Sequence, residues 1–146
     1  METINHEYYI SLEVAQLLKQ AGFDWRCRKC YNNGVLFDVE SDEIREQCPQ
    51  HSSYDVLAPT LDVAQRWLRE VKGIYIEITT IENKRAVTNS DGWTFHYEYD
   101  KPTFDCDIKD ERCEDMCTLY DSFNTYEEAQ EAGIKKALEI SLNKGK

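Results

Sequence analysis

Four residues have the types and the spacing of a zinc site. Cys27 and Cys30 are separated by two residues, and Cys48 and His51 repeat that spacing after a gap of seventeen residues. Zinc takes four thiolate or imidazole ligands in a tetrahedron, and two short chelating pairs joined by a loop supply them. The pattern therefore predicts zinc as a cofactor held by Cys27, Cys30, Cys48 and His51, in a zinc-stabilised structural or adaptor module.

Two other interpretations of these cysteines stay open. They can be unmetallated thiols, or Cys27 and Cys30 can be a redox pair whose thiolates are favoured by the neighbouring Arg26, Arg28 and Lys29. Redox pairs of the thioredoxin kind belong to a strand–helix setting, whereas this pair is followed by the turn sequence YNNG. The context is therefore unfavourable to redox catalysis.

A second group of cysteines lies in an acidic stretch. Cys113 and Cys117 are four residues apart, as on one face of a helix, and Cys106 precedes them. The many Asp and Glu residues of segment 105–115 disfavour a neighbouring thiolate. A metal site completed by His96 is one alternative, but a solvated acidic loop is the favoured interpretation.

Motifs for catalysis are absent from the sequence. It contains no phosphate-binding glycine loop, no G-x-S-x-G and no H-E-x-x-H. A small enzyme using a Cys–His pair, such as Cys48 with His96, is an alternative that no spacing supports. We therefore expect a protein that is not an enzyme and has no catalytic residue.

Aromatic residues alternate along segment 93–99. Such a face can stack on bases, as in proteins that bind single strands. The neighbourhood is not basic, so packing in the core is favoured, and the opposite face is expected to line a small-ligand pocket if it is not solvated. The residues concerned are Trp93, Phe95, Tyr97 and Tyr99 on the first face, and Tyr75, Glu77, His96 and Glu98 on the second.

Composition limits the class of protein. The chain has 146 residues, of which 41% are hydrophobic, and a net charge of −11. This length fits a single domain, residues 1–146, with a core of its own. The acidity argues against direct binding to nucleic acid.

No apolar run is long enough for a membrane span, and the start METINHEYYISLEV lacks the features of a signal peptide. We expect a cytoplasmic protein in which stable disulfides are unfavoured.

Three segments have the signature of a capped helix. Each opens on Ser11, Thr60 or Thr125, has an acid two residues later, and has Ala-Gln at the fourth and fifth residues after the opener. The hydroxyl caps a backbone N–H, and the acid faces the positive end of the helix dipole. Gly22 and Gly73 end the first two helices. Apolar stripes support all three: Val14, Leu17, Leu18 and Ala21; Val63, Ala64, Trp67, Leu68 and Val71; Tyr126, Ala129, Gly133, Ala137 and Ile140.

Strands are predicted between the helices. Segments 74–81 and 93–99 alternate with a period of two and are expected to form an antiparallel hairpin, and segment 34–40 is a further strand. The predicted fold is α+β, with three helices packed on a small antiparallel sheet in the order α-β-α-β-β-α.

Three stretches, YISLEVAQLLKQAGFDW, APTLDVAQRWLREVKGIYIEI and SFNTYEEAQEAGIKKALEISLNK, occur in an order that resembles a group of uncharacterised small phage and prophage proteins of gut Bacteroidales. The resemblance implies an accessory phage-type protein in the cytoplasm of a bacterial host. It implies no catalytic residue. Together with the acidity and small size, it leads us to expect a binding protein that engages or sequesters a host defence or regulatory component, either a protein or a small signalling molecule.

Overall fold

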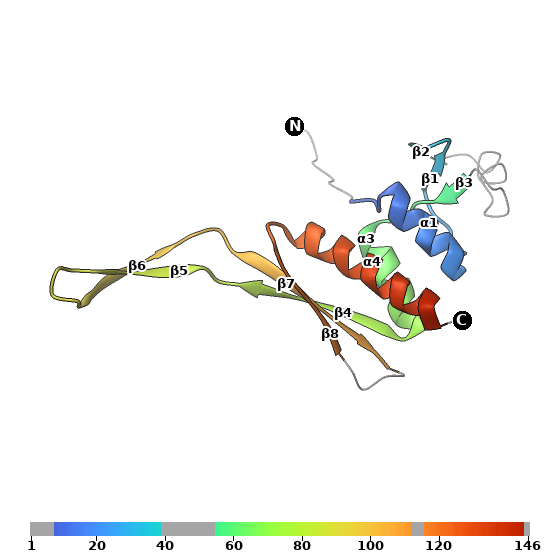
Figure 1. Ribbon diagram of the computed structural model, residues 1–146. Coiled ribbons are helices and arrows are strands. Elements are labelled where there is room, and N and C mark those ends of the chain that lie inside the picture. The colour runs from blue at the N-terminus through green and yellow to red at the C-terminus, as the bar shows by residue number, and fades with distance from the viewer. Residues whose placement is uncertain (1–7, 39–54, 112–115, 145–146) are drawn as a thin grey trace.

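The computed structural model describes residues 8–38, 55–111 and 116–144. In this part of the chain the α+β fold predicted from the sequence is confirmed, with helices packed on small antiparallel sheets (Figure 1). α1 spans Leu12–Ala21, α3 spans Leu61–Trp67 and continues into a wider π-helical turn, η1 (Leu68–Lys72), and α4 spans Tyr126–Lys144. α4 is the central element, because it packs against α1 and α3 and against the strands of the main sheet.

The helix ends form where the sequence predicts them. The hydroxyls of Ser11, Thr60 and Thr125 each accept a hydrogen bond from the backbone N–H three residues further on, at 3.4, 3.3 and 3.1 Å. Each bond satisfies one N–H that a helix start leaves without an intrahelical partner. Gly22 and Gly73 follow α1 and η1 with φ of 96° and 67°, a conformation that glycine adopts without strain.

The main sheet has the antiparallel order β4-β7-β8. β4 is Ile74–Ile81, β7 is Thr103–Asp110 and β8 is Met116–Phe123. The strand predicted at 74–81 is confirmed, but its partner is β7 and not segment 93–99. The predicted irregular loop is therefore wrong for residues 105–110. The buried Cys106 and Ile108 alternate with the acids Asp105 and Asp107, so the charge of the segment hides an alternation with a period of two.

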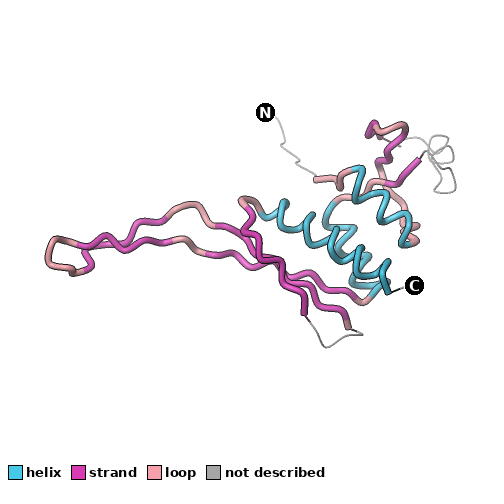
Figure 2. The backbone as a smooth tube through the Cα atoms, viewed as in Figure 1, coloured by secondary structure: helices cyan, strands magenta, loops and turns pink. Residues whose placement is uncertain are grey.

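Two further strands extend β4 and β7 beyond the body of the protein. β5 (Lys84–Thr88) and β6 (Thr94–Tyr99) pair antiparallel in a two-stranded sheet. Figures 1 and 2 show that this ribbon projects away from the helices. We call residues 82–102 the arm. Segment 93–99 is thus largely a strand, as predicted, but it pairs within the arm.

A small sheet of order β2-β1-β3 lies beside α1. β1 is Lys29–Asn32, β2 is Val35–Asp38 and β3 is Asp55–Leu57. β1 and β2 form a hairpin whose two turn residues, Asn33 and Gly34, have φ of 52° and 80°. Positive φ at both central residues is the requirement of the tight turn that matches strand twist. The strand predicted at 34–40 corresponds to β2.

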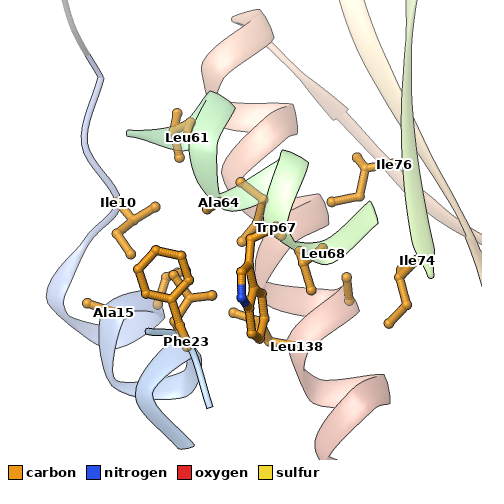
Figure 3. Packing of buried hydrophobic residues seen from close by; sticks show 14 of the residues in the cluster. Ile10, Ala15, Phe23, Leu61, Ala64, Trp67, Leu68, Ile74, Ile76 and Leu138 are labelled. Carbon is orange, nitrogen blue, oxygen red and sulfur yellow. The ribbon is translucent and has the colours of Figure 1, made fainter. Parts of the chain in front are cut away.

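The core lies where α1, α3, η1 and α4 meet, and it reaches the inner face of the main sheet (Figure 3). Its largest side chains are Trp67 and Phe23, whose rings pack edge to face with centroids 5.4 Å apart. Edge-to-face geometry is favoured because the positive ring edge meets the negative ring face. The alanines of the three helix starts, Ala15, Ala64 and Ala129, are all fully buried.

α4 approaches the main sheet most closely at Gly133. A Cβ added there would lie 2.5 Å from Cys106 Sγ and 2.9 Å from Ile76 Cγ2, both well inside ordinary contact. Glycine is thus required for the distance between the helix and the sheet. The predicted stripe of α4 is confirmed at Gly133 and Ala137, and Ile134 and Leu138 widen it.

Candidate functional site

The tip of the arm is a turn organised by Asn89. Its side-chain Oδ1 accepts hydrogen bonds from the backbone N–H groups of Asp91 and Trp93, each at 3.0 Å. Its backbone N–H donates to Trp93 O at 2.9 Å, and Gly92 has φ of 86°. An Asn side chain that mimics a backbone turn in this way is a local signal, and the sequence NSDG carries it. The turn fixes the backbone of Trp93 against Asn89, just before β6 begins.

One face of the arm is aromatic and exposed. β5–β6 pairing sets Ala86 opposite Tyr97 and Lys84 opposite Tyr99, so these four residues share a face. On this face Tyr97 is 50% exposed and Tyr99 62%. Trp93 precedes β6, beyond a register shift at Val87/Thr88, and is 74% exposed. The prediction that these aromatics pack in the core is wrong, because no helix or sheet of the described chain covers the arm (Figure 2). The Phe95 side chain lies outside the described part.

The aromatic face stays exposed because α4, which covers the same side of the main sheet, does not reach the arm. Two residues separate β4 from β5, but three separate β6 from β7, so the pairing shifts by one residue between Ile81↔Thr103 and Lys84↔Tyr99. An extra residue in one strand reverses the side to which later side chains point. By this register the arm's aromatic face continues the face of the sheet that α4 covers. The cover ends where Tyr126, the first residue of α4, meets Phe104 edge to face at 6.1 Å.

Lys84 on β5 completes the aromatic face and was not singled out from the sequence. Lys84 Nζ lies 5.1 Å from the centre of the Tyr97 ring, a cation–π contact. The arm carries four acidic and three basic residues, whereas the whole chain has a net charge of −11. The arm is therefore nearly neutral on a strongly acidic protein. The adjacent cations Lys84 and Arg85 at the start of KRAVT, in a strand that pairs with an aromatic one, are the signal that could have revealed it.

The opposite face of the arm is a charged row. Arg85 Nη2 donates to Glu98 Oε2, and His96 Nε2 lies 3.7 Å from Glu98 Oε1. The hydrogen bond from Arg85, together with its positive charge, lowers the pKa of the Glu98 carboxyl. All three side chains are solvated, so the row adds little to stability. It does give the two faces of the ribbon distinct chemistry.

The predicted small-ligand pocket does not form on this side. Tyr75 and Glu77 lie on β4 and are exposed, while His96 and Glu98 lie on the arm, so the condition of a desolvated face is not met. Near Tyr75 there is only an open depression of about 570 Å³ beside η1. There the Tyr75 hydroxyl donates to Glu111 Oε1 at 2.6 Å, and this bond raises the pKa of Tyr75.

The four predicted zinc ligands fall partly outside the described residues. Cys48 and His51 lie there, whereas Cys27 precedes β1 and Cys30 is within it. Cys30 is buried and disulfide-bonded, so the expectation that stable disulfides are unfavoured is wrong for this residue. A disulfide sulfur is not a thiolate, so zinc bound by this set requires Cys30 to be reduced. No group of three metal-ligating side chains occurs in the described ranges, and zinc remains a prediction.

Cys27 is not an activated thiol. Its Sγ donates to Trp25 O at 3.4 Å, and burial raises the pKa of the thiol to about 12. This raised pKa runs against the expectation that Arg26, Arg28 and Lys29 favour a thiolate here, because burial disfavours the charged form of the thiol. A nucleophilic or redox role for Cys27 is thus disfavoured on physical grounds.

The second cysteine group does not share a helix. Cys117 lies in β8 opposite Ile108 of β7, so the predicted helical face is wrong for it, and Cys113 lies outside the described residues. Cys106 is not in a disulfide and is buried under α4. His96 is exposed on the arm, so it does not complete a site with Cys106.

A polar network centred on the buried Gln130 joins α4, α3 and β4. Gln130 of α4 donates through Nε2 to Asp62 Oδ1 at 2.8 Å and to Gln65 Oε1 at 2.9 Å. Gln65 in turn donates to Ile76 O on β4 at 3.0 Å. Buried polar groups are tolerated when they are bonded in this way. The repeated Ala-Gln pair of the helix starts is the sequence signal for this network, and its role was not predicted.

Comparison with protein-family models, with curated proteins and with solved structures finds no match to this chain. Across the described helices, none has the length and apolar character needed to cross a membrane.

Proposed function

We propose that this is a non-enzymatic binding protein of phage type, which engages a host defence or regulatory component in the bacterial cytoplasm through the aromatic face of the arm. The observation that carries the proposal is the exposure of Trp93, Tyr97 and Tyr99 on a projecting ribbon. Large aromatic side chains are the commonest energetic anchors of protein interfaces, and a cluster of them in water indicates a contact surface.

The chemistry of the face favours a protein partner over a small molecule. A small ligand is usually held in a concave site, whereas these three aromatics are exposed on a two-stranded ribbon. Lys84 beside Tyr97 adds a cation to the apolar surface, which suits a partner with both apolar and acidic groups. The near-neutral arm also lets an acidic partner approach without meeting the charge of the body.

The phage origin and the cytoplasmic location rest on the resemblance of the three helix-start segments. The non-enzymatic character rests on the absence of catalytic motifs in the sequence and on the high pKa of the Cys27 thiol. The arm adds a surface of the kind that a binding role needs.

The test is capture from a Bacteroidales host lysate by the immobilised full chain. The arm variant carries Trp93→Ala, Tyr97→Ala and Tyr99→Ala, and the matched control carries Val35→Ala and Val71→Ala, which remove exposed apolar groups from the body. We expect a host protein that the wild type and the control retain and that the arm variant retains about tenfold less, a change typical of losing one interface anchor. Retention of the same proteins by all three chains would refute the role of the arm.

A further inference from the structure

The outer edge of β6 is open in the described chain. The arm sheet contains only β5 and β6, so each has one edge turned away from the other. The backbone N–H of Asp100 donates to Asn83 O at 2.9 Å, so Asn83 and Asp100 form a hydrogen-bonded pair of the ladder. Because antiparallel bonding alternates, His96 and Glu98 bond to β5, and the N–H and C=O groups of Tyr97 and Tyr99 point outward. An edge of this kind is a template for another strand.

We propose that a second copy of this chain pairs with that edge, antiparallel, about a twofold axis through Tyr97. In this register Tyr97 lies opposite Tyr97 of the second copy, and their outward N–H and C=O groups bond to each other. His96 of each copy lies opposite Glu98 of the other. A twofold interface requires one surface to complement itself, and this register does so.

The charged face determines which register between the two copies is favoured. Each row across the joined sheet runs from Arg85 to Glu98 of one copy and then to His96 of the other, so each carboxylate lies between two cation-forming groups. Non-hydrogen-bonded pairs of an antiparallel ladder bring side chains closest, and His96 and Glu98 occupy such pairs between the copies. If one strand is shifted by two residues relative to the other copy, Glu98 lies opposite Glu98, or His96 opposite His96, depending on the direction of the shift.

The rest of the arm agrees with a second copy as the occupant. On β5 the equivalent pairing about Ala86 sets Arg85 against Val87, which offers no charge complementarity. The projecting arms keep the acidic bodies apart, so the net charge of −11 on each chain does not oppose contact at the tips. An isolated two-stranded ribbon is marginally stable in water, and doubling it provides cross-strand partners for β6. The pairing uses the edge of the arm, so it goes beyond the binding role proposed for the aromatic face.

Sedimentation equilibrium of the full chain tests this pairing. His96→Glu sets Glu against Glu98 twice in the dimer, and Glu98→Lys sets Lys against His96 twice, so each variant alone should raise the dissociation constant about tenfold or more. Mixing the two variants restores opposite charges across the edge and should return the dissociation constant to within about threefold of the wild type. Lys101→Glu changes a charge on the arm outside the rows and should leave the constant unchanged.

Three results would overturn the proposal. They are a wild-type chain that stays monomeric up to about 1 mM, a dimer that neither variant weakens, and a mixture that associates no better than its components. Circular dichroism of each variant shows whether the body is folded. Capture of a host protein by the aromatic face is scored separately, so either proposal can fail alone.

Discussion

Gly133→Ala should separate α4 from the main sheet and lower stability, although alanine is the better helix former. The new Cβ would lie 2.5 Å from Cys106 Sγ and 2.9 Å from Ile76 Cγ2, where ordinary contacts are 3.4–4 Å. The sulfur is buried in β7, so it has no solvent to move into. Either α4 or β7 must therefore shift by about 1 Å in a close-packed interior.

The magnitude follows from two opposing effects. Overpacking a core costs about 1–3 kcal/mol, and two simultaneous short contacts place this site at the upper end. Replacing glycine by alanine within a helix returns about 1 kcal/mol. We expect the free energy of unfolding to fall by about 2 kcal/mol, which corresponds to a melting temperature lower by about 4–8 °C for a chain of this size.

Urea denaturation at fixed redox conditions measures the change, and a double-mutant cycle tests its cause. Cys106→Ala removes the closest atom, so adding it to Gly133→Ala should recover about 1 kcal/mol relative to the sum of the single changes. A Gly133→Ala chain as stable as the wild type would refute the close approach. A destabilised chain with no coupling to Cys106 would mean that the cost arises elsewhere.

Two further changes test the core and the thiol. Gln130→Leu should lower the free energy of unfolding by about 1–3 kcal/mol, because Asp62 and Gln65 each lose the donor that the buried Gln130 supplies. Urea melts measure the change, and Gln16→Leu, at the equivalent but exposed position of the motif, is the control. Equal effects of the two substitutions would contradict the role of the network. For Cys27 the pKa of the thiol is 9.0 in the unfolded chain and about 12 in the folded chain. The contribution of this thiol to the free energy of unfolding is therefore fully present below pH 9 and is lost as the pH rises toward 12. Cys27→Ala should flatten that fall in melts from pH 8 to pH 11, and slow alkylation of native Cys27 at pH 8 should accompany it; rapid labelling of the folded chain would contradict the burial.

Local signals predicted the helices well. The caps at Ser11, Thr60 and Thr125 and the stops at Gly22 and Gly73 depend on residues within one turn, so the sequence contains the whole interaction. β7 was missed because acidic residues alternate with its buried residues. The charge of a segment can be counted from its sequence, whereas its burial depends on which other elements pack against it.

The aromatic face shows where such reasoning ends. The alternation through Tyr97 and Tyr99 was read correctly as a strand with one apolar face. Whether that face is buried depends on the length of a helix that begins at Tyr126, and on one extra residue between β6 and β7. Neither is visible in the strand itself. The disulfide at Cys30 likewise depends on a contact between segments, which spacing alone does not reveal.

The arm and the main sheet are built from the same two chain segments, with one register shift between them, and this connectivity favours an order of assembly. Closing the Asn89 turn brings β5 and β6 together first, and pairing can then proceed strand by strand toward β4 and β7 without closing a long loop. β8 adds to β7 through the next short connection, and α4 emerges last. The strands of the sheet are thus able to pair during synthesis before α4, the helix that covers them, has been made. The arm, which pairs first, is the part that stays exposed to solvent in the folded protein.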